Sequence, residues 1–246
     1  FAPAADASSS SETDSPHSRQ TIVGYEIQFR VPASVVDVAN TDAMFAWADR
    51  VVSEHGSVHL IVNNAGVNLA DAAQTQSIAD VRWVMDINFW GVVHGTQAFL
   101  PHLKAAGEGH VVNVSSVFGL VSIPSQSAYN AAKFAVRGYT ESLRMELELE
   151  GANVSATSIH PGGIKTNIAR NGRSSDKVKT IESFDAVATT TPEKAARQIV
   201  RAIERNRRRA LIGPDAKVFD LVSRMPVGMT HRIIEAAAKR SDRLPI

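Results

Sequence analysis

The chain has 246 residues, of which 44% are hydrophobic and 21% are charged, so it is long enough for one large α/β domain with a substantial core. A formal net charge of +1 gives no general attraction to nucleic acid, and the absence of cysteine excludes disulfides, thiol catalysis and thiolate metal sites. No apolar run approaches the roughly 20 residues that cross a bilayer. We therefore expect a soluble, cytoplasmic protein without a transmembrane segment.

The first 20 residues are rich in serine, alanine, proline and acidic residues, and they show no periodic apolar pattern. We predict a disordered or loosely attached tail over residues 1–20 and a single domain over residues 21–246. We do not expect the tail to act as a secretory signal, because it has neither a basic start nor an apolar central block. Residues 21–31 alternate in part between polar and apolar side chains, which is compatible with a strand.

From residue 34 onward, short apolar runs alternate with longer segments of helical periodicity. Asn40 or Thr41 is positioned to cap the first helix, and Gly56 ends it. The polar residues 167–190 predict a mobile loop or short lid helices over the site. Strands are predicted at residues 34–38, 110–114, 153–161 and 210–213, with a strand followed by a loop at 59–66. Helices are predicted at residues 41–55, 78–103 with an interruption near 88–91, 128–150, 191–205, 219–225 and 230–239.

The predicted strands are apolar throughout rather than on one face, which is typical of parallel strands covered by helices on both sides. The sequence therefore predicts an α/β fold with a doubly wound, Rossmann-like parallel sheet. Ligands of such sheets bind at the carboxyl ends of the strands. Four groups of polar or small residues are expected at that edge: Asp37, residues 63–66, Ser116 and residues 161–163.

Residues 115–133 place a hydroxyl, a phenol and an ammonium where they could share one proton. Tyr129 and Lys133 are four residues apart on a predicted helix and therefore share a face. A nearby ammonium favours the phenolate, so we expect the pKa of Tyr129 to fall from about 10 toward neutral pH, as acid–base work on an alcohol requires. A serine at the preceding strand end, Ser115 or Ser116, would hydrogen-bond the reacting oxygen. A lone Tyr-x-x-x-Lys is mostly packing with a solvated amine; the serine pair favours catalysis.

This arrangement resembles the short-chain dehydrogenase/reductase family, in which a serine precedes Tyr-x-x-x-Lys by about a dozen residues. Ser116, Tyr129 and Lys133 fit that spacing, and Ser115 fits it less well. The resemblance implies an NAD(P)-dependent oxidoreductase that interconverts an alcohol and a carbonyl, with NAD or NADP as cofactor. It implies that Tyr129 is the general acid/base, that Lys133 lowers its pKa and holds the ribose, and that Ser116 binds the reacting oxygen.

Two asparagine-containing motifs extend the resemblance. Asn64, Ala65 and Gly66, in the run Asn-Asn-Ala-Gly, match the family's structural and cofactor-contacting motif, although an ordinary turn has the same composition. Asn88 is unfavourable inside a helix unless it has a task. The resemblance implies that it sits at a helix distortion and supports a proton relay to the lysine; the alternative is a residue bonded to its own backbone.

Two further matches lie after predicted strands. Asp37 matches the aspartate that bonds the adenine ring, and a cap for the following turn explains it nearly as well. Pro161 and Gly162, with Thr166, match the stretch flanking the nicotinamide, and a simple turn explains the Pro-Gly pair equally well in isolation. The resemblance therefore implies cofactor contacts at all three positions, while the residues themselves leave the simpler alternatives open.

One departure from the family concerns the phosphate-binding loop. The family's first strand–turn–helix carries a glycine-rich loop that cradles the pyrophosphate, whereas the only glycine before Gly56 here is Gly24. We therefore expect the first βαβ unit to be incomplete or divergent. This leaves a second hypothesis, a catalytically silent binding or scaffold protein built on the same fold.

Partner predictions follow from the same residues. Phe118, Val121 and Ile123 suggest an apolar wall for a small alcohol or carbonyl substrate. The long helices at 78–103 and 128–150 match those that pair subunits in the family, so a homodimer or homotetramer is expected, with no nucleic-acid partner. The basic run at 205–209 is interpreted as a solvated helix end. We assign no metal site, since His94 and His160 are flanked by apolar residues and lack partners at metal-ligand spacing.

Overall fold

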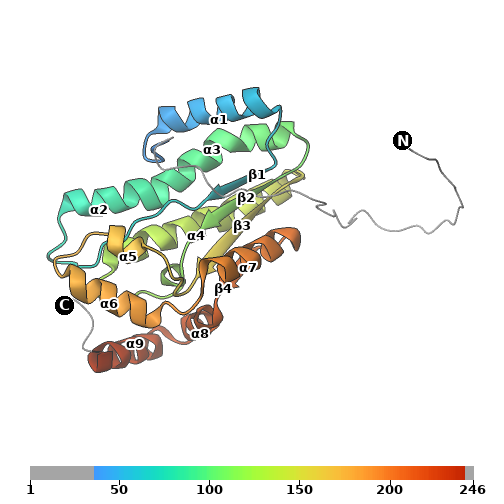
Figure 1. The fold of residues 1–246 in the computed structure, drawn as a ribbon. Helices are drawn as coiled ribbons and strands as arrows, with labels where there is room; N and C mark the ends of the chain where they lie inside the picture. Colours follow the sequence, from blue (N-terminus) through green and yellow to red (C-terminus); the bar gives the residue numbers. More distant parts are fainter. Residues whose placement is uncertain (1–35, 242–246) are drawn as a thin grey trace, which may run out of the picture. The chain divides into compact units, whose positions relative to one another are not determined.

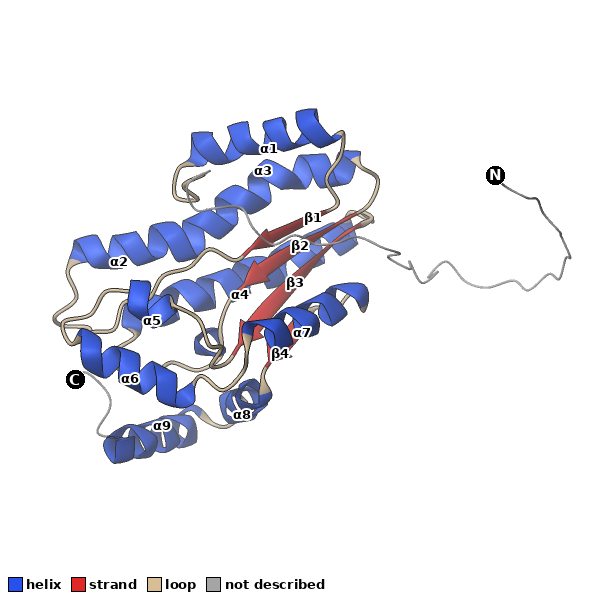
Figure 2. Ribbon diagram, in the orientation of Figure 1, coloured by secondary structure: helices blue, strands red, loops and turns tan. Residues whose placement is uncertain are grey.

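The computed structural model describes residues 36–241, which fall within one compact unit. Its sheet has four parallel strands in the order β1-β2-β3-β4 (Figures 1 and 2). The parallel register places Val62 opposite Val112 and Val112 opposite Thr157. The predicted parallel α/β sheet is therefore confirmed. The strands are β1 (Leu60–Asn63), β2 (Gly109–Val114), β3 (Val154–Pro161) and β4 (Arg209–Ile212).

Both faces of the sheet are covered by helices (Figure 1). Val111 belongs to a core shared with α1, α3 and α4, whereas its neighbour Val112 belongs to a core shared with α7. Successive side chains of a strand point to opposite faces, so these two clusters lie on the two sides of the sheet. Helices on both faces make this the predicted doubly wound arrangement.

The helix boundaries up to α7 agree closely with the sequence predictions, whereas the helix predicted at residues 219–225 begins five residues earlier, as α8 (Pro214–Ser223). Asn40 caps α1 by accepting from the backbone N–H of Ala43 at 3.0 Å, and Gly56 ends it with φ of 80°. Thr191 caps α7 immediately before Pro192, which suits proline because the first helical N–H needs no partner. The helices are α1 (Thr41–His55), α2 (Ile78–Met85), α3 (Gly91–Ala105), α4 (Ser127–Leu149), α5 (Ile168–Asn171), α6 (Lys177–Val187), α7 (Pro192–Glu204), α8 (Pro214–Ser223) and α9 (Val227–Ser241).

The long helical segment beginning at Ile78 is interrupted as predicted. A π-helical turn, Asp86–Trp90, separates α2 from α3. A π turn accommodates one extra residue per turn and often marks a functional position. The segment predicted as a loop or short lid helices forms α5 and α6, which are tied to the rest of the fold by parallel bridges between Leu69 and Arg173 and between Ile164 and Thr190.

The strand predicted at residues 34–38 is wrong where the structure describes it. Residues 36–38 form a loop and turn with no strand partner. Val36 and Val38 pack instead against the core shared by α1 and α3, and the carbonyl of Val38 accepts from Nδ1 of His94 at 3.0 Å. The apolar, β-branched residues Val36 and Val38 therefore indicate burial here and not strand pairing. The predictions for residues 1–20 and 21–31 lie outside the described residues.

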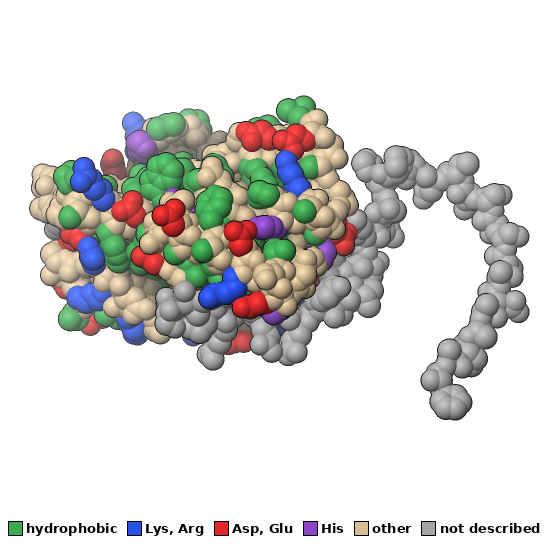
Figure 3. All heavy atoms as spheres, turned by 90° about the horizontal axis from the view of Figure 1, so that it is seen from above, with side chains coloured by type: hydrophobic (Ala, Val, Ile, Leu, Met, Phe, Trp, Pro, Cys, Tyr) green, Lys and Arg blue, Asp and Glu red, His purple; other side chains and the backbone are tan. Residues whose placement is uncertain are grey.

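Within residues 36–241, no helix is both long and apolar enough to cross a membrane. The surface seen from above α1 carries apolar side chains interspersed with acidic and basic ones (Figure 3). Large apolar side chains are exposed on the helices expected to pair subunits, including Ile78 at 67%, Met145 at 54% and Leu149 at 88%.

Candidate active site

The carboxyl end of β2 and the first turns of α4 bring the predicted hydroxyl and phenol together. Ser116 follows β2 and caps a short 3-10 turn, Val117–Gly119, by accepting from the N–H of Phe118 at 3.1 Å. Tyr129 lies in the first turn of α4, near enough to Ser116 for the serine side chain to lower the pKa of its hydroxyl by hydrogen bonding. Lys133 is one turn further on, with Nζ 5.6 Å from the centroid of the Tyr129 ring.

Burial sets the protonation of these groups. Ser116, Tyr129 and Lys133 have 7%, 9% and 3% of their surface exposed. Burial raises the pKa of Tyr129 to about 12, and the hydrogen bond from Ser116 opposes this rise. Burial also lowers the pKa of Lys133 to about 8. The predicted fall in the pKa of Tyr129 is thus wrong for this state of the protein, because desolvation of the phenolate outweighs the hydrogen bond from Ser116.

The two serines after β2 have different partners. Ser115 donates from Oγ to the backbone carbonyl of Lys133 at 2.7 Å, which ties α4 to the end of β2. Gly119 lies against the same carbonyl, which a Cβ at this position would approach to 2.7 Å. Ser115 is thereby committed to packing, and the structure places Ser116, the serine favoured by spacing, beside the phenol.

Asn88 and the loop after β1 converge on the lysine. Asn88 is fully buried in the π turn; its Oδ1 accepts from the N–H of Val67 at 2.8 Å and its Nδ2 donates to the carbonyl of Val67 at 2.9 Å. A Cβ on Gly66 would lie 3.3 Å from Oδ1 of Asn88 and 3.5 Å from Nζ of Lys133. Glycine leaves room at this point, and Asn64, Ala65 and Gly66 are exposed beside it.

The turn after β3 is the other predicted contact region. Pro161 ends the strand, Gly162 and Gly163 follow partly buried, and Thr166 is exposed. The N–H of Gly163 donates to Oδ2 of Asp215 at 2.6 Å. Sequence reasoning missed Asp215, because an acidic residue in the first turn of a helix is common and gives no sign of a contact 52 residues away.

Asp37 lies in the turn before α1 and is exposed. Its carboxylate accepts from the N–H of Ala39 at 3.0 Å, which is the turn-capping contact that the sequence left open. The same carboxylate remains accessible for an adenine contact.

His160 is buried against the site and holds its backbone. Its Nδ1 donates to the carbonyl of Ser116 at 2.9 Å, and its Nε2 therefore accepts from the hydroxyl of Ser158 at 2.9 Å. Burial lowers the pKa of His160 to about 4, so the ring is neutral. Across residues 36–241 there is no group of three histidine or acidic side chains that could hold a metal ion.

A buried amide network, which sequence reasoning also missed, joins β1 and β2 to α4. Asn63 donates from Nδ2 to Oδ1 of Asn113 at 2.8 Å and lies 3.2 Å from the hydroxyl of Thr96. Asn113 donates in turn to the hydroxyl of Thr140 at 3.0 Å. The two asparagines are paired in the parallel register. Their equivalent places at the ends of two apolar strands were the signal in the sequence that could have indicated this pairing.

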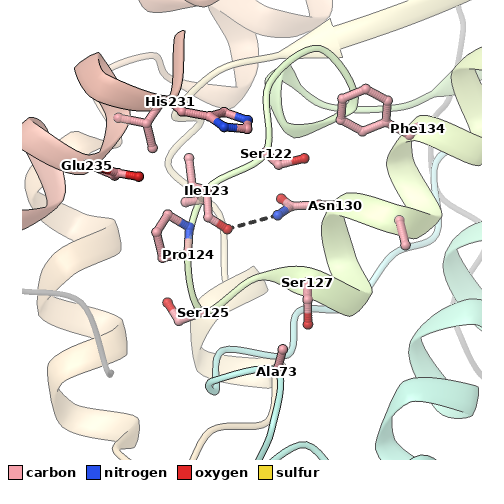
Figure 4. A pocket seen from close by; sticks show the side chains of 12 residues that line it. Ala73, Ser122, Ile123, Pro124, Ser125, Ser127, Asn130, Phe134, His231 and Glu235 are labelled. Carbon is pink, nitrogen blue, oxygen red and sulfur yellow. Dashed lines mark hydrogen bonds between the residues drawn. The ribbon is translucent and has the colours of Figure 1, made fainter. Parts of the chain in front are cut away.

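A separate pocket of about 560 Å³ lies between α9 and the loop that leads into α4 (Figure 4). Ile123 and Pro124 from the loop face His231 and Glu235 from α9 across it. None of the predicted site residues lines this pocket. Ile123, expected to form part of a substrate wall at the site, lines this pocket instead, and Val121 is buried in the interior.

Comparisons with known proteins bear on the family and the fold of the chain. A family model described as short chain dehydrogenase matches residues 10–177. SadH of Mycobacterium tuberculosis is 43% identical over 215 residues, covering 86% of this chain and 78% of SadH. A 3-ketodihydrosphingosine reductase of Bacteroides thetaiotaomicron is 34% identical over 155 residues, covering 63% of this chain and 57% of the reductase.

The solved structures show the same fold. A short chain dehydrogenase/reductase from Burkholderia phymatum in complex with NAD superposes with a TM-score of 0.71 and 28% identity, covering 86% of this chain and 76% of that one. Together, the parallel sheet, the ordered motifs and these matches define a Rossmann-fold oxidoreductase class. The chain belongs to the short-chain dehydrogenase/reductase family.

The residues present fit the nicotinamide and ribose end of a dinucleotide. Gly66 leaves space beside Lys133 and Asn88, and the turn after β3 offers backbone amides and the exposed hydroxyl of Thr166. A glycine-rich loop for the phosphates is not found in the described residues before Gly56, since residues 36–55 contain no glycine. The described residues therefore fit the nicotinamide and its ribose, which form the reacting half of the cofactor.

Proposed function

We propose that this protein is a nicotinamide-dependent oxidoreductase that interconverts an alcohol and a carbonyl on a small apolar molecule. The observation that carries the proposal is the common burial of Ser116, Tyr129 and Lys133 where β2 ends and α4 begins, with Nζ of Lys133 5.6 Å from the centroid of the Tyr129 ring. Burying each of these three polar groups costs desolvation free energy. Packing alone therefore does not explain why all three are buried where a strand ends and a helix begins. Their common location supports proton transfer to one oxygen.

In the reducing direction, the hydroxyls of Ser116 and Tyr129 donate to the carbonyl oxygen of the substrate and hold it. When bound at this site, a reduced nicotinamide would supply the hydride for the reduction. Tyr129 gives its proton to the same oxygen, which becomes the hydroxyl of the product. A pKa of about 12 before substrate binds keeps Tyr129 protonated and ready to act as an acid.

Lys133 stabilises the phenolate that this transfer leaves behind. Its ammonium is close to the ring of Tyr129 and donates to the carbonyl of Val114 at 3.0 Å, which fixes the direction of the side chain. Asn88 holds the loop at Val67 through both ends of its amide. We infer that Asn88 supports the relay that returns a proton to Tyr129 through Lys133.

NAD or NADP is the proposed cofactor. Lys133 would hold the nicotinamide ribose, while the backbone of Pro161 and Gly162, with the hydroxyl of Thr166, would meet the carboxamide. The loop containing Asn64, Ala65 and Gly66 would lie along the cofactor, and Asp37 would bond the adenine. The Burkholderia phymatum relative with bound NAD supports a dinucleotide on this fold.

An apolar substrate is proposed from the aromatic side chains next to Tyr129. Phe118 packs edge-on against Tyr129 and against Phe219 of α8, each at 6.1 Å between ring centroids. The similarity to a 3-ketodihydrosphingosine reductase supports a carbonyl on an apolar chain. A homodimer or homotetramer is proposed from the exposed apolar side chains of α2 and α4, and its measurement is light scattering of the purified protein.

The test is a titration of the purified chain with NADH and NADPH, followed by nicotinamide absorbance in the presence of aliphatic and aromatic ketones. We expect saturable dinucleotide binding and oxidation of the cofactor that requires the ketone. A chain that binds dinucleotide without turnover on any ketone or alcohol would be a binding protein, and one that binds neither dinucleotide would refute the proposal.

A further inference from the structure

The turn after β3 is held from three sides by elements distant in sequence. The N–H of Gly162 donates to the carbonyl of Ile212 at the end of β4 at 2.9 Å, and the carbonyl of Gly163 accepts from the N–H of Thr190 at 3.1 Å. The N–H of Gly163 donates to Oδ2 of Asp215 at 2.6 Å. The last contact is the only one of the three that a side chain makes.

The carboxylate of Asp215 occupies space that glycines leave open. A Cβ on Gly162 would overlap both carboxylate oxygens, and a Cβ on Gly213 would lie 2.7 Å from Oδ1. Gly213 has φ of 95°, in the left-handed region that favours glycine. The carboxylate of Asp215 thus fits between the β3 turn and the start of α8 only because residues 162 and 213 have no Cβ.

A general role at the helix start does not account for this contact. Glu193 occupies the same position in α7 as Asp215 in α8, one residue after a proline in the first turn. Glu193 is exposed, and hydrogen bonds to its own backbone and to Thr191 lower the pKa of its carboxyl. Both residues complement a helix dipole, but only Asp215 reaches another element, while its Oδ1 is buried without a hydrogen-bond partner.

We propose that Asp215 is a positioning residue for the nicotinamide end of the cofactor site. Its carboxylate fixes the peptide of Gly163 by a charge-assisted hydrogen bond. That peptide sets the direction in which the turn presents its backbone and Thr166 to the carboxamide. This inference rests on the proposed function, because it assigns the β3 turn to the nicotinamide.

The prediction is an effect confined to one end of the dinucleotide. Asp215→Ala removes the acceptor of the Gly163 amide, so we expect NADH or NADPH, whichever the wild type binds, to bind about tenfold more weakly, as loss of a charge-assisted hydrogen bond allows. ADP-ribose, which lacks the nicotinamide, should bind as to the wild type. Asp215→Asn keeps an acceptor of the same shape and should restore part of the affinity.

Equilibrium titrations of wild type, Asp215→Ala, Asp215→Asn and the control Glu193→Gln with the dinucleotide and ADP-ribose provide the test. Amide hydrogen exchange at Gly163 without cofactor gives an independent readout, and exchange should be faster in Asp215→Ala. If Asp215→Ala does not fold, Asp215→Asn carries the comparison, with a loss smaller than tenfold expected.

Three outcomes would overturn the inference. These are unchanged dinucleotide affinity in the Asp215 variants, equal weakening of dinucleotide and ADP-ribose, and a loss in Glu193→Gln that matches the loss in Asp215→Asn. Each of these leaves the proposed function standing, since the wild type still binds. A wild type that binds neither dinucleotide refutes the proposed function, and the inference with it.

Discussion

Two groups of buried polar side chains lie between β2 and α4, and they differ in how they are satisfied. In the network of Asn63, Asn113 and Thr140, neutral amides and hydroxyls bond one another. At the site, Tyr129 and Lys133 are titratable, and burial moves the pKa of each away from its ordinary value. Buried polar groups are common where partners exist. The candidate site differs from the amide network because it holds two titratable side chains with displaced pKa values one helical turn apart.

Among the variants that test the difference between the candidate site and the amide network, Tyr129→Phe is expected to have the largest effect. Removing the hydroxyl removes the proposed proton donor, so kcat should fall by about 10³-fold, within the range of general acid–base catalysis. Steady-state kinetics measure this, with Tyr139→Phe on the same helix as the control. A Tyr129→Phe enzyme with nearly wild-type kcat would remove Tyr129 from the mechanism.

The pH dependence of stability tests whether burial lowers the pKa of Lys133. Its pKa is about 8 when folded against an ordinary value of 10.5. Between these values the unfolded chain binds the proton and the folded chain does not, so its contribution to the free energy of unfolding rises with pH, by roughly 3 kcal/mol over the window. Tyr129, raised from 10 to about 12, contributes in the opposite direction only above about pH 10.

Lys133→Met keeps the apolar stem and removes the charge. Urea unfolding of wild type and Lys133→Met at about pH 8 and about pH 10 should show the wild type gaining stability relative to the variant as the pH rises. If the free energies of unfolding of the two proteins changed equally with pH, the pKa of Lys133 would be the same in the folded and unfolded chains.

A smaller effect is expected in the amide network. Asn113→Ala removes two buried hydrogen bonds, the shortest one that the amide of Asn63 donates and the one from Asn113 to Thr140, so the free energy of unfolding should fall by about 2 kcal/mol. The control is Asn153→Ala, whose exposed side chain donates to the carbonyl of Gly107 at 2.9 Å and should cost less than about 1 kcal/mol. Urea unfolding measures both variants. Equal losses in the two variants would mean that burial does not increase the contribution of these hydrogen bonds to the free energy of unfolding.

The smallest effect is expected at Gly138, between the two groups on the exposed side of α4. A Cβ there meets nothing within 4 Å, so Gly138→Ala should raise the free energy of unfolding by about 0.5–1 kcal/mol through helix propensity. Thermal unfolding checks this, with activity unchanged. Gly119→Ala, which would press on the backbone of Lys133, should instead lower both stability and activity.

Local sequence patterns determined much of this protein. The cap expected at Asn40 or Thr41, the break near Asn88 and the four strands of the sheet follow from spacing and residue type, because neighbours in the chain decide them. The preference for Ser116 over Ser115 came from the resemblance to the family. The run at residues 36–38 is the exception, since an apolar pattern records burial whether or not a strand partner is present.

Only the tertiary structure decided the rest. The direction of the Tyr129 pKa shift depends on how completely α4 and the β2 end exclude water, and spacing along a helix does not encode this. The contact between Asp215 and Gly163 and the pairing of Asn63 with Asn113 join residues about 50 positions apart. Such contacts arise when parallel strands bring their ends to one edge, so they depend on the assembled sheet rather than on any single segment.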